Sequence, residues 1–197
     1  FSKIKKEENV NSNLKLSISN KKIQVLLMFA GVFCCVAMSM PQVHIVPLCI
    51  DNGFGLAVGT EILSFMLFAA VTSRVLFGFL SDKIGPIQTL ILGSTLQAIS
   101  LSMFLPFDSQ LSLYIVAICF GLSQGGIVPI YAVIISKFLP ENEVAERVGL
   151  LIFATIVGMS LGGWLSGEIY DYTNSYQMAF LNGIFWNLIN LLIMFYL

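Results

Sequence analysis

The chain has 197 residues, of which 57% are hydrophobic and only 11% are charged, and its net charge is −1 at pH 7. Because soluble domains carry about a quarter charged residues, this composition excludes a water-soluble globular fold. The hydrophobic residues form long uncharged runs, and a helix needs about 20 such residues to cross the hydrocarbon core of a bilayer. The runs are continuous and do not alternate, so they predict membrane helices and not barrel strands.

The first 22 residues are rich in Lys, Asn and Ser and lack the apolar side chains that a folded segment needs, which predicts a polar linker. Residues 23–197 are predicted to form one all-α integral membrane domain with six transmembrane helices. The spans, joined by short polar segments, cover about residues 23–50, 56–80, 87–107, 111–138, 146–169 and 176–197. Two prolines, Pro41 and Pro47, are expected to interrupt the first span.

The basic residues are confined to one side of this predicted topology. With six spans, both chain ends and the joints after the second and fourth spans face the same side, and all ten Lys and Arg residues fall there. They are the six lysines of the linker together with Arg74, Lys83, Lys137 and Arg147. The opposite joints carry acids such as Asp51, Asp108 and Asp171. By the positive-inside rule, this predicts a multi-pass protein of the inner (plasma) membrane with both ends cytoplasmic.

The remaining composition indicates no cofactor, metal or nucleic-acid partner. The four cysteines lie inside hydrophobic runs without metal-type spacing, and we interpret them as small packing residues. The chain begins with Phe1 instead of Met and stops at Leu197 within apolar sequence, so we expect a fragment of a longer protein.

The joint between the second and third spans reads Gly78-Phe-Leu-Ser-Asp82-Lys83-Ile-Gly85. Gly78 permits close helix contact, Gly85 permits a tight turn, and Asp82 can meet the positive ends of helices. The segment resembles the major facilitator superfamily signature G-x-x-x-D-[RK]-x-G, which lies at this joint in each six-helix half. The resemblance implies that Gly78, Asp82, Lys83 and Gly85 form a gating motif that helps to lock one conformation. An ordinary capped turn is the alternative.

The basic residues that usually follow this signature are replaced here by Pro86, Ile87 and Gln88, as expected of the weaker copy in the second half. The resemblance extends over nearly the whole chain, which looks like the C-terminal half of bacterial transporters similar to monocarboxylate and oxalate/formate porters. It is carried by His44 to Pro47, Asp51 to Gly53, Arg74 to Gly85, Gly121 to Pro129, Gly162 to Gly167 and Tyr170 to Tyr176. It implies a secondary active transporter of a small organic anion, proton-coupled or exchanging, with an N-terminal six-helix half as its partner.

Arg74 is the main candidate for substrate binding. It lies about 12 Å along its helix from Asp82, where a charge costs about 2.5–3.5 kcal/mol on insertion scales, and its fork of donors fits a carboxylate. In the porters named above, an arginine on this helix faces the anion, which implies the same for Arg74; snorkelling or structural pairing is the alternative. Ala70 stands where monocarboxylate carriers can bear an aspartate, so the proton-carrying residue is unassigned. The second cation that the oxalate porter carries on its eleventh helix has no counterpart here, because the fifth span contains no Lys or Arg beyond Arg147 at its start.

Several other residues are weaker candidates. His44, the only histidine, could gate or take a proton, or simply bond a neighbouring helix. Gln124 and Tyr131 could line a cavity, or act as polar contacts between helices. Four glycines repeat every four or five residues and predict one packed helix face, with a dimer contact as the alternative. They are Gly158, Gly162, Gly163 and Gly167.

Two other classes of function compete with the anion transporter. A membrane enzyme would need clustered His, Asp or Glu within the spans, and the single histidine and scattered end-of-helix acids do not supply a catalytic or metal site. A non-transporting sensor or assembly subunit stays open, as does a transporter of an unrelated small solute. All of these would sit in a lipid bilayer.

Overall fold

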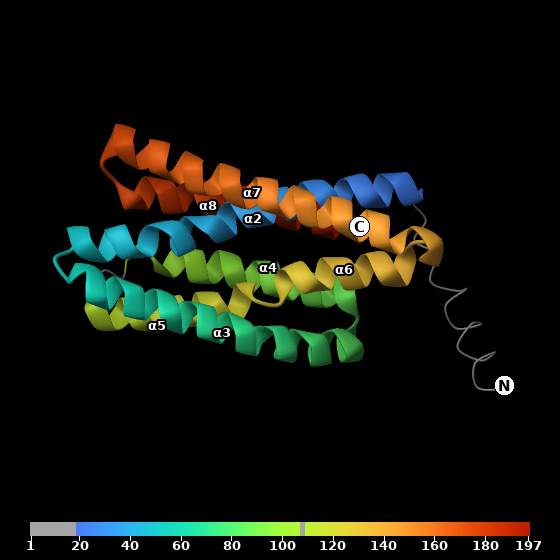
Figure 1. Cartoon of the computed structure of the whole chain (residues 1–197), viewed down its shortest axis with the longest axis horizontal. Helices are drawn as coiled ribbons and strands as arrows, with labels where there is room; N and C mark the ends of the chain where they lie inside the picture. Colours follow the sequence, from blue (N-terminus) through green and yellow to red (C-terminus); the bar gives the residue numbers. More distant parts are fainter. Residues whose placement is uncertain (1–18, 107–108) are drawn as a thin grey trace.

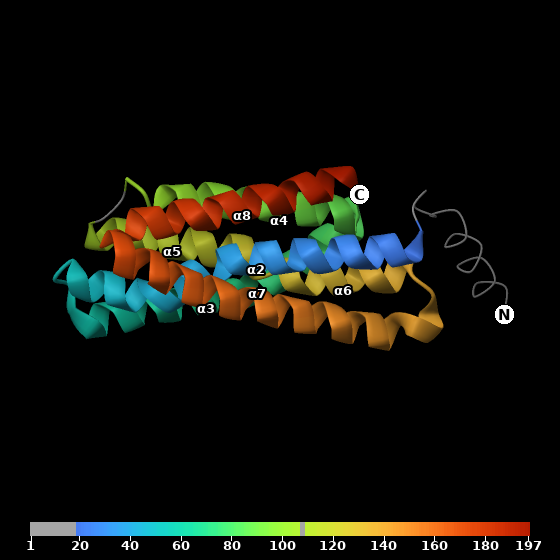
Figure 2. The same ribbon diagram turned by 90° about the horizontal axis from the view of Figure 1, so that it is seen from above.

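The computed structural model describes residues 19–106 and 109–197, and the helices within them run along the longest axis of one bundle (Figures 1 and 2). The polar linker predicted for residues 1–22 lies mostly outside the described residues, as does Asp108. The helices are α2 (Asn20–Asp51), α3 (Gly55–Ile84), α4 (Pro86–Met103), α5 (Gln110–Gln124), α6 (Ile127–Phe138), α7 (Val144–Thr173) and α8 (Tyr176–Tyr196), with a short 3-10 helix at Glu141–Glu143 before α7.

Five helical segments are long and apolar enough to cross a membrane, namely α2, α3, α5 with α6, α7 together with the 3-10 turn before it, and α8. The sixth helix, α4, has only 18 residues and carries more polar side chains. Thr89, Ser94 and Gln97 of α4 are fully buried, so its polar groups face other helices. The fold is therefore all-helical, with six segments of which five are membrane-span candidates.

The helix bounds differ from the hydrophobic runs in physically interpretable ways. α2, α3 and α7 each extend past the apolar stretch by several residues, because a helical backbone bonds itself whatever side chain it carries. The predicted span 111–138 is broken at Gly125–Gly126. Two glycines weaken the helix there, and Pro129 has no N–H to donate to the carbonyl four residues earlier, that of Gly125.

The first span, by contrast, is not interrupted. The expectation that Pro41 and Pro47 would break it is wrong, because α2 continues through both residues. Each proline leaves one carbonyl without its helical donor, those of Ala37 and Val43. Helix packing favours the continuous conformation, since α2 contacts α7, α8 and α3 and Gly183 of α8 lies against the backbone of Ala37.

The bundle is organised around α2. In α2, 67% of the most hydrophobic stretch is buried, against 33% for α3 and 28% for α7, and α2 packs against α7, α8 and α3. The outward faces of α3 and α7 are strongly apolar, as shown by Phe68 (72% exposed) and Phe153 (65% exposed). Such faces are stable against lipid or further protein, and not against water.

Close backbone approach fixes two helix pairs. At Gly158 and Gly162 of α7, a Cβ would collide with the backbone of Val32 and Val36 in α2. At Gly121 of α5 and at Gly125, which follows the end of α5, a Cβ would collide with the backbone of α3 at Met66 and Ala70. Small residues at these crossings allow the dense packing on which membrane helices depend for association.

Both ends of the described bundle carry inter-helix polar contacts. At one end Lys22 Nζ donates to Tyr196 Oη at 2.8 Å, which ties the start of α2 to the end of α8. At the other end the hydroxyls of Tyr170 and Tyr176 donate to Asp51 Oδ2 at 2.7 and 2.9 Å. These contacts join α2 to α8 at both ends of the bundle, and α2 to α7 at the Asp51 end.

Candidate functional site

The interruption between α5 and α6 forms one wall of a small cavity of about 170 Å³. α2, α3 and the α5–α6 segment contribute its lining. The lining residues are Met38, Gln42, Leu67, Ala70, Val71, Arg74, Gln124, Gly125 and Val128. A larger cavity of about 660 Å³ between α7 and α8 is lined mainly by apolar and aromatic side chains. We regard the smaller cavity as the candidate site because it contains Arg74.

Arg74 lies ten residues before the last residue of α3, Ile84, which places it about 15 Å along the helix from that end. Its side chain is exposed at the cavity. Within residues 19–106 and 109–197, the salt bridge that forms is Arg147 with Glu143, and none involves Arg74. A permanent cation within an apolar span thus lacks an acidic partner from the described part of the chain.

Gln124 is the second polar residue of the cavity. It ends α5, is 1% exposed, and its Oε1 accepts a hydrogen bond of 3.0 Å from Gln42 Nε2 of α2. Its own Nε2 has no hydrogen-bond partner in the part of the chain that the structure describes. Gln124 is thus a buried residue of the cavity lining with one unpaired donor group.

Tyr131 lies in a different environment. It is fully buried and donates from its hydroxyl to Asn190 Oδ1 at 2.9 Å, while Asn190 Nδ2 donates to Ser94 Oγ at 2.9 Å. Asn187 Nδ2 adds a bond of 3.0 Å to the Ser94 carbonyl. This network joins α6, α8 and α4, and Tyr131 is not among the residues that line the Arg74 cavity.

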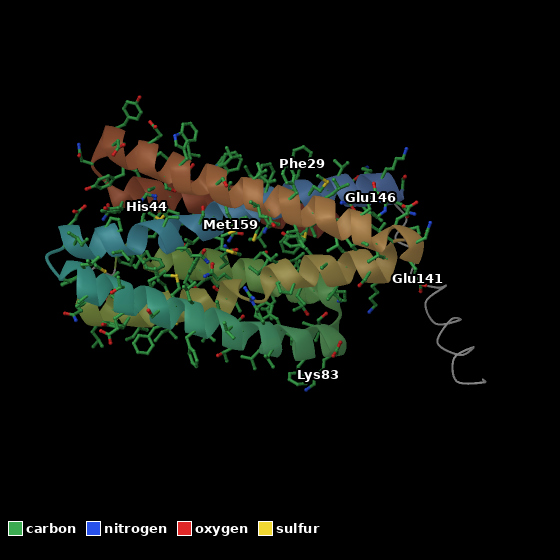
Figure 3. All side chains as sticks on the ribbon, viewed as in Figure 1. Phe29, His44, Lys83, Glu141, Glu146 and Met159 are labelled. Carbon is green, nitrogen blue, oxygen red and sulfur yellow. The ribbon has the colours of Figure 1, made fainter. Side chains whose placement is uncertain are left out.

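His44 links α2 to α7. Its Nε2 lies 3.1 Å from the carbonyl oxygen of Gly163, so this nitrogen carries the proton that the bond requires. Gly158 and Gly162 face α2 directly, whereas a Cβ at Gly163 or Gly167 would make only ordinary contacts. Figure 3 shows His44 toward one end of the bundle and Lys83 toward the other.

The segment from Gly78 to Gly85 forms the end of α3 and the turn into α4. Gly85 has a φ of 92°, which favours glycine, and its carbonyl accepts a bond of 2.8 Å from Thr89 Oγ1. Asp82 and Lys83 are exposed, and a Cβ at Gly78 would meet nothing within 4 Å. The described residues therefore account for the turn at Gly85, and leave Gly78, Asp82 and Lys83 free for contacts with other protein.

Two inter-helix contacts are not predicted by the sequence. Gln42 was not distinguished from other polar residues, although it lies two positions before His44 and orients Gln124. The sequence does not predict that Asp51, a residue of one joint, bonds Tyr170 and Tyr176, which flank another. In both cases the partners are far apart in sequence, and only helix packing brings them together.

Comparison with known proteins places the chain among membrane transporters. A sequence model described as "Major Facilitator Superfamily" matches residues 24–197. Monocarboxylate transporter 13 of Rattus norvegicus is 29% identical over 143 residues, which cover 72% of this chain and 33% of that protein. The MFS-type transporter opdF of Penicillium oxalicum is 29% identical over 157 residues, which cover 76% of this chain and 37% of that protein. The chain thus spans about a third of the length of the curated relatives it matches.

Proposed function

This chain belongs to the major facilitator superfamily, a family of non-enzymatic membrane transporters, and from that premise we propose that it is the C-terminal six-helix half of a secondary transporter for a small organic anion. The chain matches only about a third of its relatives' length, and its signature lacks the basic residues that usually follow the second glycine. An N-terminal half would complete a transporter in which two halves rock about a central site.

The cavity beside Arg74 is the observation that carries this proposal. A guanidinium within a span needs a partner, and none of the cavity-lining residues is an acid. A carboxylate in the cavity would supply that partner, because the planar fork of Arg donates two parallel hydrogen bonds to two carboxylate oxygens. Arg74 is therefore the substrate-binding residue of this half.

A monocarboxylate fits better than a dicarboxylate. Arg74 is the single cation of the cavity lining, so a second carboxylate would enter an apolar site without a charge to compensate it. The name of the Rattus norvegicus relative, monocarboxylate transporter 13, agrees with this single positive charge. Ala70 and not an acid lies one turn before Arg74, so a proton would be carried by a group other than an acid at that position, or transport proceeds by exchange.

The ends of the bundle give an orientation. Lys83 lies in the last turn of α3 and Lys137 in the last turn of α6, and Figure 1 shows these helix ends at the same end of the bundle as the start of α2. We assign that end to the cytoplasm of a cell bounded by the plasma membrane. Asp82 and Lys83 would then gate from the cytoplasmic side, and His44 would act as a gating or proton-accepting residue near the outer side.

Uptake into proteoliposomes tests the proposal. The full-length protein is reconstituted, and uptake of labelled acetate, lactate and pyruvate is measured with and without a pH gradient. We expect uptake of at least one of them by the parent protein, and loss of it in Arg74→Ala and Arg74→Lys, because Lys cannot reproduce the bidentate geometry. Lys137→Ala is the matched control, since Lys137 is exposed at the bundle end.

Two results would contradict the proposal. Equal uptake by the parent, Arg74→Ala and Arg74→Lys would show that the anion does not bind at Arg74. Absence of uptake by the parent for every monocarboxylate, under both gradients, would favour a transporter of another solute or a non-transporting sensor or assembly subunit.

A further inference from the structure

We infer that the side-chain amide of Gln124 is a second ligand of the transported anion, and that Gln42 holds this amide in the binding orientation. The inference rests on the proposed anion site at Arg74. It adds a neutral hydrogen-bond donor from a different helix, α5, to the cation supplied by α3.

The first support is the unpaired donor. Gln124 is 1% exposed, and its Nε2 has no hydrogen-bond partner among the described residues. Buried side-chain donors in folded proteins are almost always paired, because leaving one unpaired forfeits its interaction with water without replacement. A partner must therefore reach Nε2 during the working cycle of the protein.

The second support is the composition of the cavity wall. Arg74 carries donors only and cannot accept a bond from Gln124. Apart from Gln42, whose Nε2 already donates to Gln124 Oε1 at 3.0 Å, the other lining side chains are apolar, as at Met38, Leu67 and Val128. The remaining side-chain acceptor of the walls, Gln42 Oε1, does not bond Gln124 Nε2 in the described part of the chain, so the acceptor comes from the molecule that occupies the cavity.

The third support is electrostatic. With Oε1 bonded to Gln42, the free end of the Gln124 amide is its donor group, and the guanidinium of Arg74 lines the same cavity. Two donor groups in one lining that holds no acid match the oxygens of an anion, and they would repel or fail to pair a cation.

The fourth support is rigidity. Gly125 has no room for a Cβ against the backbone of Ala70, so α5 is pressed onto α3 one residue after Gln124. Ser73 Oγ adds a bond of 2.6 Å to the carbonyl of Leu122 at the same contact. The backbones that carry Arg74 and Gln124 are therefore held by one tightly packed helix pair, which limits the backbone entropy lost when the anion binds.

The test measures uptake kinetics of the full-length protein in proteoliposomes, using the labelled monocarboxylate among acetate, lactate and pyruvate that the parent transports best. For Gln124→Leu we expect KM to rise about tenfold or more, as for the loss of a hydrogen bond to a charged group, with kcat changed by less than about threefold. Gln124→Glu should raise KM further, because the introduced carboxylate competes with the substrate for Arg74. Gln42→Leu should raise KM by a smaller factor, since it frees the amide without removing it.

Gln97→Leu is the matched control. Gln97 is also a fully buried glutamine, but it bonds Cys34 across α4 and α2 and does not line the cavity. A purely structural role for buried glutamines predicts the same loss of folded protein in Gln97→Leu and Gln124→Leu, with the parent KM in both. If Gln124 binds the anion, KM rises in Gln124→Leu and stays at the parent value in Gln97→Leu. If Gln124→Leu does not fold, Gln124→Asn keeps the amide but shortens its reach, and the same rise in KM is expected.

The outcomes separate the inference from the function on which it rests. Loss of uptake in Arg74→Ala together with an unchanged KM in the folded Gln124 variants would overturn the role of Gln124 and leave the anion site standing; a water molecule or the other half would then satisfy Nε2. Absence of monocarboxylate uptake by the parent would overturn both.

Discussion

Alanine at Gly162 of α7 should separate two helices that now touch. A Cβ there would lie 2.6 Å from Val36 Cα, and real Cβ atoms essentially never approach other heavy atoms within 3.0 Å. The obstructing atoms include backbone, so relief requires that α7 move away from α2 along their contact. Overpacking of this kind costs about 1–3 kcal/mol, and we expect Gly162→Ala to lower the thermal midpoint by several degrees.

The adjacent glycine provides the control. A Cβ at Gly163 would meet only Val43 Cγ2 at 3.4 Å, which is an ordinary contact. Gly163→Ala should therefore keep the packing and raise the free energy of unfolding by up to about 1 kcal/mol, because alanine loses less backbone entropy in a helix than glycine does. The same substitution at two neighbouring glycines is thus predicted to lower stability at position 162 and to raise it at position 163.

The assay can use the protein's own thiols. Cys34, Cys35 and Cys49 are buried and free, so a thiol-reactive dye added to the detergent-solubilised full-length protein reports their exposure as the bundle opens on heating. The reasoning is refuted if Gly162→Ala unfolds at the same temperature as Gly163→Ala, or above it.

Two further predictions concern the interior and the topology. Tyr131→Phe removes the donor to Asn190 Oδ1 and leaves a buried acceptor unpaired, so we expect the free energy of unfolding to fall by about 1–3 kcal/mol, seen as a lower midpoint in the same thermal assay. Because Tyr131 does not line the cavity, the KM for uptake should stay at the parent value. A raised KM would contradict its placement. The topology is tested with single cysteines in a background without native cysteines. Lys83→Cys and Lys137→Cys should react with a membrane-impermeant thiol reagent only from the cytoplasmic side, whereas Asp171→Cys should react only from outside. Labelling of Lys83→Cys and Lys137→Cys from opposite sides would disprove the orientation.

The hydrophobic runs predict which parts of the chain are helical because burial in lipid depends on composition, which is local in sequence. The contact of Gly158 and Gly162 with α2 likewise has a local signal, the spacing of small residues. The pairing of Gln42 with Gln124 has none, since the partners are 82 positions apart and meet only when α2 and α5 adopt one rotation about their axes.

The break at Gly125–Gly126 and the continuity of α2 show a second limit of sequence reasoning. Both segments contain proline, at position 129 in one and at positions 41 and 47 in the other, yet only the first segment breaks. The difference is that two glycines precede Pro129, so the backbone there has little intrinsic preference for helix, whereas α2 is surrounded by α3, α7 and α8. Local propensity yields to packing where neighbours are dense.

The prolines of α2 also have a mechanical consequence. A helical ladder without bonds to the carbonyls of Ala37 and Val43 is less stiff than a complete one, so thermal bending of α2 is concentrated between about residues 37 and 47. The preceding half, clamped to α7 where Val32 meets Gly158, behaves as a rigid rod. Compliance in this helix is thus confined to the stretch that also carries Gln42 and His44.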